Sequence, residues 1–207
     1  FSTPELFQEN VKNYYRLVTG VDEAVGKVVE KLRELNLDEN TIVIYTSDHG
    51  FSLGEHGMMG KWYGYEKGIH VPLIINDLRP NARFKNVKAE QLALNIDIAP
   101  TVLSLAGVPT PSVMQGVDLF QVVQKKLPER KYFFYEHSVF ASPMLPKVEG
   151  LISKDFKYFN YTEHNFESFY DTGKYPDETH DVARDKRYQK KLMAVKALYV
   201  KEKKAIE

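Results

Sequence analysis

The sequence predicts an α/β fold followed by a small antiparallel sheet with a terminal helix, and three observations support this. Apolar residues recur every three or four positions between Pro4 and Asn36, which predicts a long amphipathic helix. After a short loop, the β-branched and aromatic run Thr41–Thr46 has the composition of a buried strand, and this order is typical of layered α/β folds. From Arg130 onward, aromatic-rich stretches alternate with tight turns, as in an antiparallel meander.

The remaining elements follow from similar patterns. Val71–Ile75 is a second apolar strand, and Pro72 indicates a strand start or a sheet edge. Pro100–Ala106 reads as a helix, with proline in its first turn. A final amphipathic helix is expected from about Asp185 to the end of the chain.

The composition of the sequence becomes rich in aromatic residues after Arg130, which predicts a domain boundary between Lys125 and Arg130. We expect residues 1–127 to belong to an α/β domain. Residues 128–207 would then form the small antiparallel sheet and the terminal helix.

Composition excludes several classes of function for these 207 residues. The 28 basic and 28 acidic residues balance, so no nucleic-acid partner is expected. Cysteine is absent, which excludes disulfides, thiolate metal sites and a cysteine nucleophile within the segment. No uninterrupted apolar run approaches the roughly 18 residues of a membrane span.

Asp48 and His49 stand side by side where the strand Thr41–Thr46 ends. In open α/β sheets, functional groups gather beyond the carboxyl ends of strands. A carboxylate and an imidazole together suit a divalent metal, and Gly50 and Gly54 would let the backbone fold closely around it. The alternative is a simple turn, in which Asp48 caps a helix and His49 is incidental.

The surrounding residues resemble a known family. The stretch "NTIVIYTSDHGFSLGEHGMMGKWYGYEKGIHVPLII" is similar to the signature region of the sulfatases, members of the alkaline phosphatase superfamily. The stretches "FFYEH", "VEGLISKDFKYF" and "FYD" resemble the small C-terminal sheet of bacterial arylsulfatases that act on sulfated sugars. The resemblance implies part of an alkaline-phosphatase-like α/β/α sandwich, and a sulfuric ester hydrolase that acts on a sulfated sugar or an aryl sulfate.

The resemblance also implies roles for three residues. Asp48 and His49 would be two ligands of one divalent ion, which is usually calcium in this family. Because calcium prefers oxygen ligands, magnesium, manganese or zinc would suit the histidine better. Lys61 would contact the sulfate group and neutralise its charge in the transition state, although most lysines are simply solvated.

Two further histidines are weaker candidates. His56 could support the metal site by contacting one of the metal ligands, or it could only order its loop. His137, in "YEH", could line the substrate pocket. Asp22 and Asp97 are expected to fix helix ends rather than to take part in chemistry.

The family's nucleophile is a formylglycine, made by oxidising a Cys or Ser in a short C/S-x-P-S/A-x-R motif, and two acidic metal ligands lie near the N-terminus of the enzyme. The 207 residues contain no such motif. The resemblance therefore implies that they are the C-terminal portion of an enzyme whose N-terminal part supplies the formylglycine. It also implies a periplasmic or secreted location.

Two other functions remain open on this sequence. One is a phosphoryl-group enzyme of the same superfamily, either a phosphonate or phosphate ester hydrolase or a phosphoethanolamine transferase, because a tetrahedral anion is handled in the same way. The other is a non-catalytic binding module that keeps the fold. The upstream nucleophile would separate the first from a sulfatase. The intact Asp48–His49 pair together with Lys61 argues against the second, and a test of metal binding would separate it from an enzyme.

Overall fold

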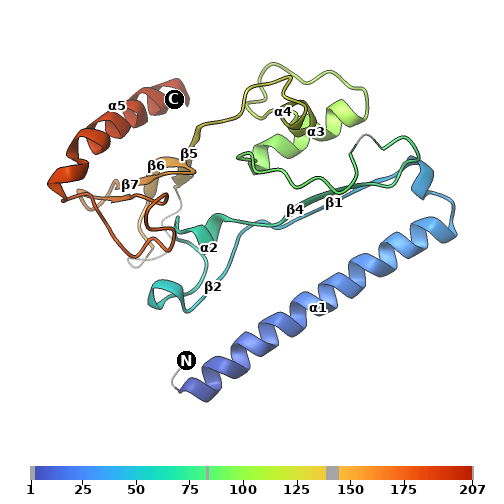
Figure 1. Cartoon of the computed structure of the whole chain (residues 1–207), viewed down its shortest axis with the longest axis horizontal. Helices are drawn as coiled ribbons and strands as arrows, with labels where there is room; N and C mark the ends of the chain where they lie inside the picture. The colour runs from blue at the N-terminus through green and yellow to red at the C-terminus, as the bar shows by residue number, and fades with distance from the viewer. Residues whose placement is uncertain (1–2, 83, 139–144, 207) are drawn as a thin grey trace. The chain divides into compact units, whose positions relative to one another are not determined.

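The computed structural model describes residues 3–82, 84–138 and 145–206, and Figure 1 shows their helices and strands. The chain forms two compact units. Unit 1 contains residues 1–59 and 71–87, and unit 2 contains residues 60–70 and 88–207. The predicted division between residues 1–127 and 128–207 concerns the domains of a whole enzyme and stays a prediction.

Unit 1 begins with the helix α1 (Pro4–Glu34), which confirms the long helix expected from the apolar periodicity. Thr3 caps it, because its Oγ1 accepts a hydrogen bond from the backbone N–H of Leu6 at 3.3 Å. The prediction that Asp22 fixes a helix end is wrong, since the helix continues past it to Glu34. A 3₁₀ turn, η1 (Asp38–Asn40), follows the helix. No helix in the described ranges is long and apolar enough to cross a membrane.

The two strands of unit 1 pair with each other. The strand β1 (Ile42–Thr46) runs antiparallel to β4 (Leu73–Asp77), with Ile44 opposite Ile75. β4 begins directly after Pro72, which confirms the predicted strand start. β1 is half-buried rather than fully buried, because β4 is its only strand neighbour among the described residues.

Three short elements shape the loop after β1, namely β2 (Ser52–Leu53), the 3₁₀ turn η2 (Glu55–Gly57) and β3 (Met59–Gly60). β2 and β3, which have two residues each, pair with each other. The left-handed φ angles of Gly54, Gly57 and Gly60 explain why this loop is rich in glycine.

Unit 2 contains the expected antiparallel meander. Its four strands are hydrogen-bonded in sequence order, and they are β5 (Tyr132–His137), β6 (Val148–Ser153), β7 (Lys157–Tyr161) and β8 (Phe166–Tyr170). The terminal helix is α5 (Gln189–Ile206), which a 3₁₀ turn, η4 (Lys186–Tyr188), precedes. Both the meander and the final helix are therefore confirmed.

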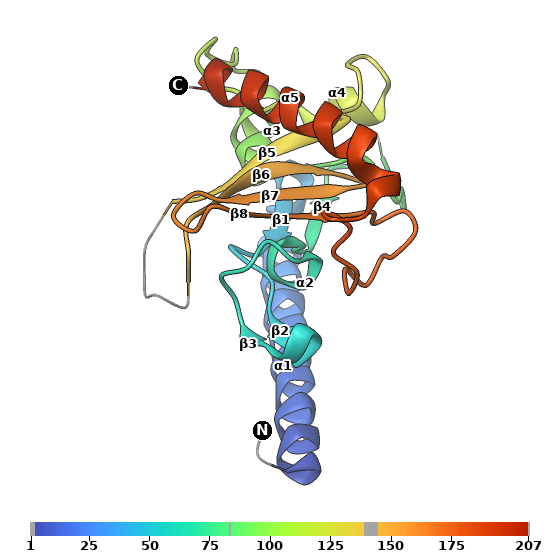
Figure 2. The ribbon, with the colours of Figure 1, turned by 90° about the vertical axis from the view of Figure 1, so that its left-hand side faces the viewer.

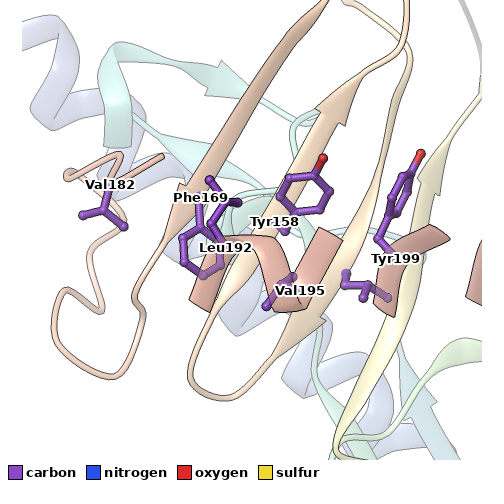
Figure 3. Close-up of a cluster of buried hydrophobic side chains, with 7 residues drawn as sticks. Tyr158, Phe169, Val182, Leu192, Val195 and Tyr199 are labelled. Carbon is purple, nitrogen blue, oxygen red and sulfur yellow. The ribbon is translucent and has the colours of Figure 1, made fainter. Parts of the chain in front are cut away.

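Side chains that alternate along these strands form two buried clusters. One cluster packs with α5 and contains Leu151, Tyr158, Phe169, Val182, Leu192, Val195 and Tyr199, most of which Figure 3 labels. The other contains Val148, Ile152, Phe159 and Tyr170, with Tyr65 and Ile69 packed against it. Figure 2 shows α5 above the sheet and α2 (Glu66–Ile69) below it, so each face has its own cover. Tyr158, Phe159, Phe169 and Tyr170 are buried, and most other aromatic residues of the meander are partly buried and pack against these clusters.

Further short helices precede the four-stranded sheet in the sequence of unit 2, namely η3 (Asn95–Asp97), α3 (Ile98–Leu105) and α4 (Leu119–Val123). Asp97 is fully buried and accepts a hydrogen bond from the backbone N–H of Leu94 at 2.8 Å, which confirms its role at a helix start. Arg130 Nη2 lies 2.8 Å from Asp97 Oδ1, so the carboxylate also ties these helices to the start of the sheet.

Candidate active site

Asp48 and His49 directly follow β1, in a loop whose residues hydrogen-bond to one another. The Ser47 hydroxyl donates to the His49 carbonyl at 3.1 Å, and the His49 N–H donates to Asp48 Oδ1 at 3.0 Å. His49 Nε2 lies 3.4 Å from Asp48 Oδ2. Because the Asp48 side chain is 81% exposed, this pair is open to a ligand.

The hydrogen bond of His49 Nδ1 determines whether His49 Nε2 can bind a metal. His49 Nδ1 lies 2.8 Å from the Gly50 carbonyl oxygen. A carbonyl oxygen only accepts hydrogen bonds, so Nδ1 carries the proton of the neutral ring and Nε2 carries the lone pair. Two ligands at about 2.0–2.2 Å from one ion are about 3 Å apart. The 3.4 Å between Nε2 and the Asp48 carboxylate is compatible with a shared metal ion.

The carboxyl group of Asp48 favours its ionised form. Desolvation opposes ionisation, but hydrogen bonds from the Asp48 and His49 backbone and the Ser47 hydroxyl, together with the positive charge that His49 carries when it is protonated, outweigh it and lower the pKa of Asp48. The ionised carboxylate is the form that binds a cation.

Asp48 and His49 form a pair rather than a complete set of metal ligands. Within residues 3–82, 84–138 and 145–206, no three His, Cys, Asp or Glu side chains are placed to hold a metal ion together. The donor types nevertheless fit a divalent cation, since a carboxylate oxygen and an imidazole nitrogen occur together in many such sites.

Aromatic contacts dock the loop after His49 on α1. Phe51 stacks on Tyr14, with ring centroids 5.8 Å apart and 28° between the planes. Gly54 lies against Phe7, and a Cβ at Gly54 would be 3.0 Å from Phe7 Cε2. The seven-residue step from Phe7 to Tyr14 along the helix and the three-residue step from Phe51 to Gly54 along an extended loop both cover about 10 Å. The two contacts can therefore form at the same time. The loop therefore follows the surface of the helix.

His56 is an exposed residue at the turn of this loop, with a left-handed φ of +56°. The neighbouring Glu55 shapes the turn, because its Oε2 accepts a hydrogen bond from the Leu53 N–H at 2.6 Å. That His56 supports the metal ligands stays a prediction.

Lys61 and His137 both belong to unit 2, and Trp62 connects them. Lys61 Nζ lies 4.9 Å from the centroid of the Trp62 ring, which is within cation–π range. The Trp62 ring meets the His137 ring edge-on, with centroids 6.0 Å apart and 79° between the planes. Two of the predicted site residues thus come together through an aromatic residue that the sequence analysis did not single out.

A buried ion cluster anchors the segment that follows Lys61. Lys157, on β7, is 2% exposed, and its Nζ lies 2.8 Å from Glu66 Oε2 and 2.7 Å from Glu178 Oε1. Glu178 Oε2 accepts a hydrogen bond from the Glu66 N–H at 2.7 Å. Sequence reasoning missed this cluster, although a lysine inside the aromatic run "DFKYFNY" was an available signal.

Close packing holds the same segment on the sheet. A Cβ at Gly64 would lie 2.5 Å from Cε1 of the buried Phe159 ring, so only glycine fits there. Desolvation raises the pKa of Glu66, but the hydrogen bond and charge of Lys157 and the charge of His70 outweigh it, and the pKa is lowered. Glu66 is therefore ionised and tied to β7, a few residues after Lys61.

Comparison with known proteins shows what this arrangement is similar to. A family profile described as "Sulfatase" matches residues 2–108, just over half of the 207 residues. The chain is 34% identical over 193 residues to the N-acetylglucosamine-6-O-sulfatase of Bacteroides thetaiotaomicron, and the match covers 89% of this chain and 34% of that protein.

Solved structures have the same fold over nearly the whole chain. One, described as a complex with its substrate D-glucosamine-2-N,6-O-disulfate, has a TM-score of 0.83 and 31% identity over 96% of this chain and 41% of its own. The phosphonate monoester hydrolase of Silicibacter pomeroyi has a TM-score of 0.86 and 25% identity over 99% of this chain and 43% of its own. The chain thus spans between a third and less than half of these relatives.

Proposed function

The chain belongs to the sulfatase family, and from this premise we propose that it is the C-terminal portion of a sulfuric ester hydrolase that acts on a sulfated carbohydrate. The similarity to an N-acetylglucosamine-6-O-sulfatase supports this substrate class. N-acetylglucosamine 6-sulfate is accordingly the substrate to test. The complete fold would be an alkaline-phosphatase-like α/β/α sandwich, with residues 1–127 in it and residues 128–207 as the appended sheet and helix.

One observation carries the proposal. Inside the segment that matches the family, Asp48 Oδ2 and His49 Nε2 lie 3.4 Å apart on an exposed loop. These two atoms would hold one divalent ion, which is calcium by analogy with the family, or magnesium, manganese or zinc by ligand chemistry. When bound, such an ion polarises the oxygens of a sulfate ester. The hydrogen bond to the Gly50 carbonyl would keep the imidazole oriented toward the ion.

Lys61 and His137, two of the other predicted residues, would bind the substrate. The Lys61 ammonium would contact a sulfate oxygen and offset its negative charge as the ester bond breaks. His137 would donate a hydrogen bond to a sugar hydroxyl, and His56 would order the metal-binding loop. The formylglycine nucleophile and the remaining acidic ligands would come from residues outside these 207.

The likeness to a phosphonate monoester hydrolase favours one second candidate, a phosphoryl-ester hydrolase of the same superfamily. Assays of the full-length enzyme on N-acetylglucosamine 6-sulfate and on a phenyl phosphonate monoester would separate the two. Faster turnover of the sulfate ester is expected, and faster turnover of the phosphonate would favour the alternative. Turnover of neither substrate would favour a non-catalytic binding module.

Metal analysis tests the assignment of Asp48 and His49. Elemental analysis of the full-length enzyme should find about one divalent ion per chain, and Asp48→Ala should lose most of it because an anionic ligand is removed. Asp38→Ala, a carboxylate of the same unit outside the loop, is the matched control and should retain the metal. An Asp48→Ala enzyme with undiminished metal and full activity would show that the assignment is wrong.

A further inference from the structure

We propose that Trp62 is a substrate-binding residue, which stacks its indole ring on the sugar ring that carries the sulfate. This inference rests on the proposed function and extends it from the sulfate group to the sugar. The observations that carry it are the backbone conformation of Trp62, its exposure, and its contacts with Lys61 and His137.

The backbone of Trp62 is strained. Its φ is +97°, a value that a residue with a bulky side chain rarely adopts. Such a conformation is unfavourable and persists only where the surroundings enforce it, most often at functional sites. Here the following segment is held by the tight contact of Gly64 with Phe159 and by the Lys157 ion cluster. A fixed anchor therefore maintains the unusual orientation of the indole.

The Trp62 ring is available to a ligand. The residue is 43% exposed although it is the largest apolar side chain of unit 2. Phe166, on β8, is exposed to a similar extent, 44%, but its backbone has an ordinary negative φ. Exposure alone therefore does not distinguish Trp62 from Phe166. What distinguishes Trp62 is that its exposed aromatic ring stands on a strained backbone.

The neighbours of Trp62 match the two parts of a sulfated sugar. Lys61 Nζ, 4.9 Å from the ring centroid, supplies a positive charge for the sulfate. In a sulfate ester the sulfur is joined to the sugar through a single oxygen, so a sulfate at Lys61 places the sugar within reach of the adjacent indole. The flat apolar face of an indole is complementary to the C–H face of a pyranose ring.

His137 completes the group at the edge of the indole. Its Nδ1 is buried and has no hydrogen-bond partner among the described residues. A buried polar atom without a partner costs free energy, so it calls for an explanation such as a bound ligand or water. A sugar hydroxyl bound beside the indole would be such a partner.

The test uses Trp62→Leu in the full-length enzyme, with Phe166→Leu as the matched control. Loss of stacking should raise KM for N-acetylglucosamine 6-sulfate about tenfold, which corresponds to about 1.4 kcal/mol. The inhibition constant of inorganic sulfate, which has no sugar, should change by less than about threefold, because Lys61 remains. Trp62→Phe should restore most of the affinity, and Phe166→Leu should leave both constants unchanged.

Each outcome bears on one proposal. Equal weakening of sugar sulfate and inorganic sulfate would mean that Trp62 only orients Lys61, and the stacking proposal would be overturned. An unchanged KM in Trp62→Leu would overturn it as well. Failure of the wild-type enzyme to hydrolyse any sulfate ester would instead contradict the proposed function.

Discussion

The two units position their functional groups by different physical means. In unit 1, Asp48 and His49 are oriented by hydrogen bonds within four consecutive residues, and none of the residues of α1 is buried. In unit 2, the segment after Lys61 is held by a lysine on β7 and by Glu178, which is far away in the sequence. Every buried hydrophobic residue of the described chain belongs to unit 2.

The difference shows which kind of substitution should damage each group. A site built from local hydrogen bonds depends on a few neighbouring residues and little on a core. A site anchored through buried, distant charges depends on the whole sheet, because a single unpaired charge in a low-dielectric interior is costly. Substitutions that unfold the chain should therefore concentrate in unit 2.

The largest effect is expected from Lys157→Met. It leaves Glu178 buried without its positive partner, so the free energy of unfolding should fall by about 3–5 kcal/mol. Lys31→Met is the control in unit 1, where Lys31 and Glu34 are 65% and 63% exposed, and it should cost less than about 1 kcal/mol. Urea denaturation followed by circular dichroism measures both, and similar losses would contradict the distinction between the units.

Glycine substitutions should act in opposite directions in the two units. Gly64→Ala forces a Cβ against the buried Phe159 ring and should cost about 1–3 kcal/mol. Gly26→Ala meets no atom within 4 Å in α1 and should stabilise the chain by about 0.5–1 kcal/mol through helix propensity. Thermal denaturation of the two variants compares them directly. Destabilisation by Gly26→Ala would show that this side of α1 is more crowded than the structure indicates.

Docking of the loop on α1 should contribute more modestly to the metal site. Phe51→Leu removes the stack on Tyr14, which is worth about 0.5–1.5 kcal/mol. The affinity of the full-length enzyme for its divalent ion should then fall by about two- to tenfold. Calorimetric titration of the metal-free enzyme measures this, with Phe166→Leu in unit 2 as the control. An unchanged affinity in Phe51→Leu would mean that the local hydrogen bonds alone orient the ligands.

The smallest effect should appear only in acid. The lowered pKa of Glu66 in the folded chain contributes stability that is fully present above the unfolded pKa of about 4.3 and is lost as the pH falls through the lower, folded pKa. Unit 2 should therefore lose stability below about pH 4.3, and Glu66→Gln should weaken this dependence. Glu34→Gln, in the exposed pair of α1, is the control. An identical acid profile in wild type and Glu66→Gln would assign the dependence to other carboxyl groups.

Much of the fold could be predicted because its signals are local. The helix expected from Pro4 to Asn36 forms as Pro4–Glu34, and the meander forms in the predicted order because its strands are neighbours in sequence. The adjacency of Asp48 and His49 is also a local property, so their pairing was visible in advance. The expected full burial of the strand at Thr41–Thr46 was not found in unit 1, because composition reports how apolar a strand is and not how many neighbours cover it.

The sequence by itself determined the two long helices, the strands of the meander, the family, and the residue types at the proposed metal and sulfate sites, since periodicity and motif spacing act over a few residues. Only the tertiary structure decided that Trp62 lies between Lys61 and His137 and that Lys157 pairs with Glu66 and Glu178. Apart from Lys61 and Trp62, which are neighbours, these contacts join residues far apart in the chain, and their energies depend on burial and distance. Burial and distance exist only once the sheet has formed, so a pattern along the chain could draw attention to Lys157 but could not identify its partners.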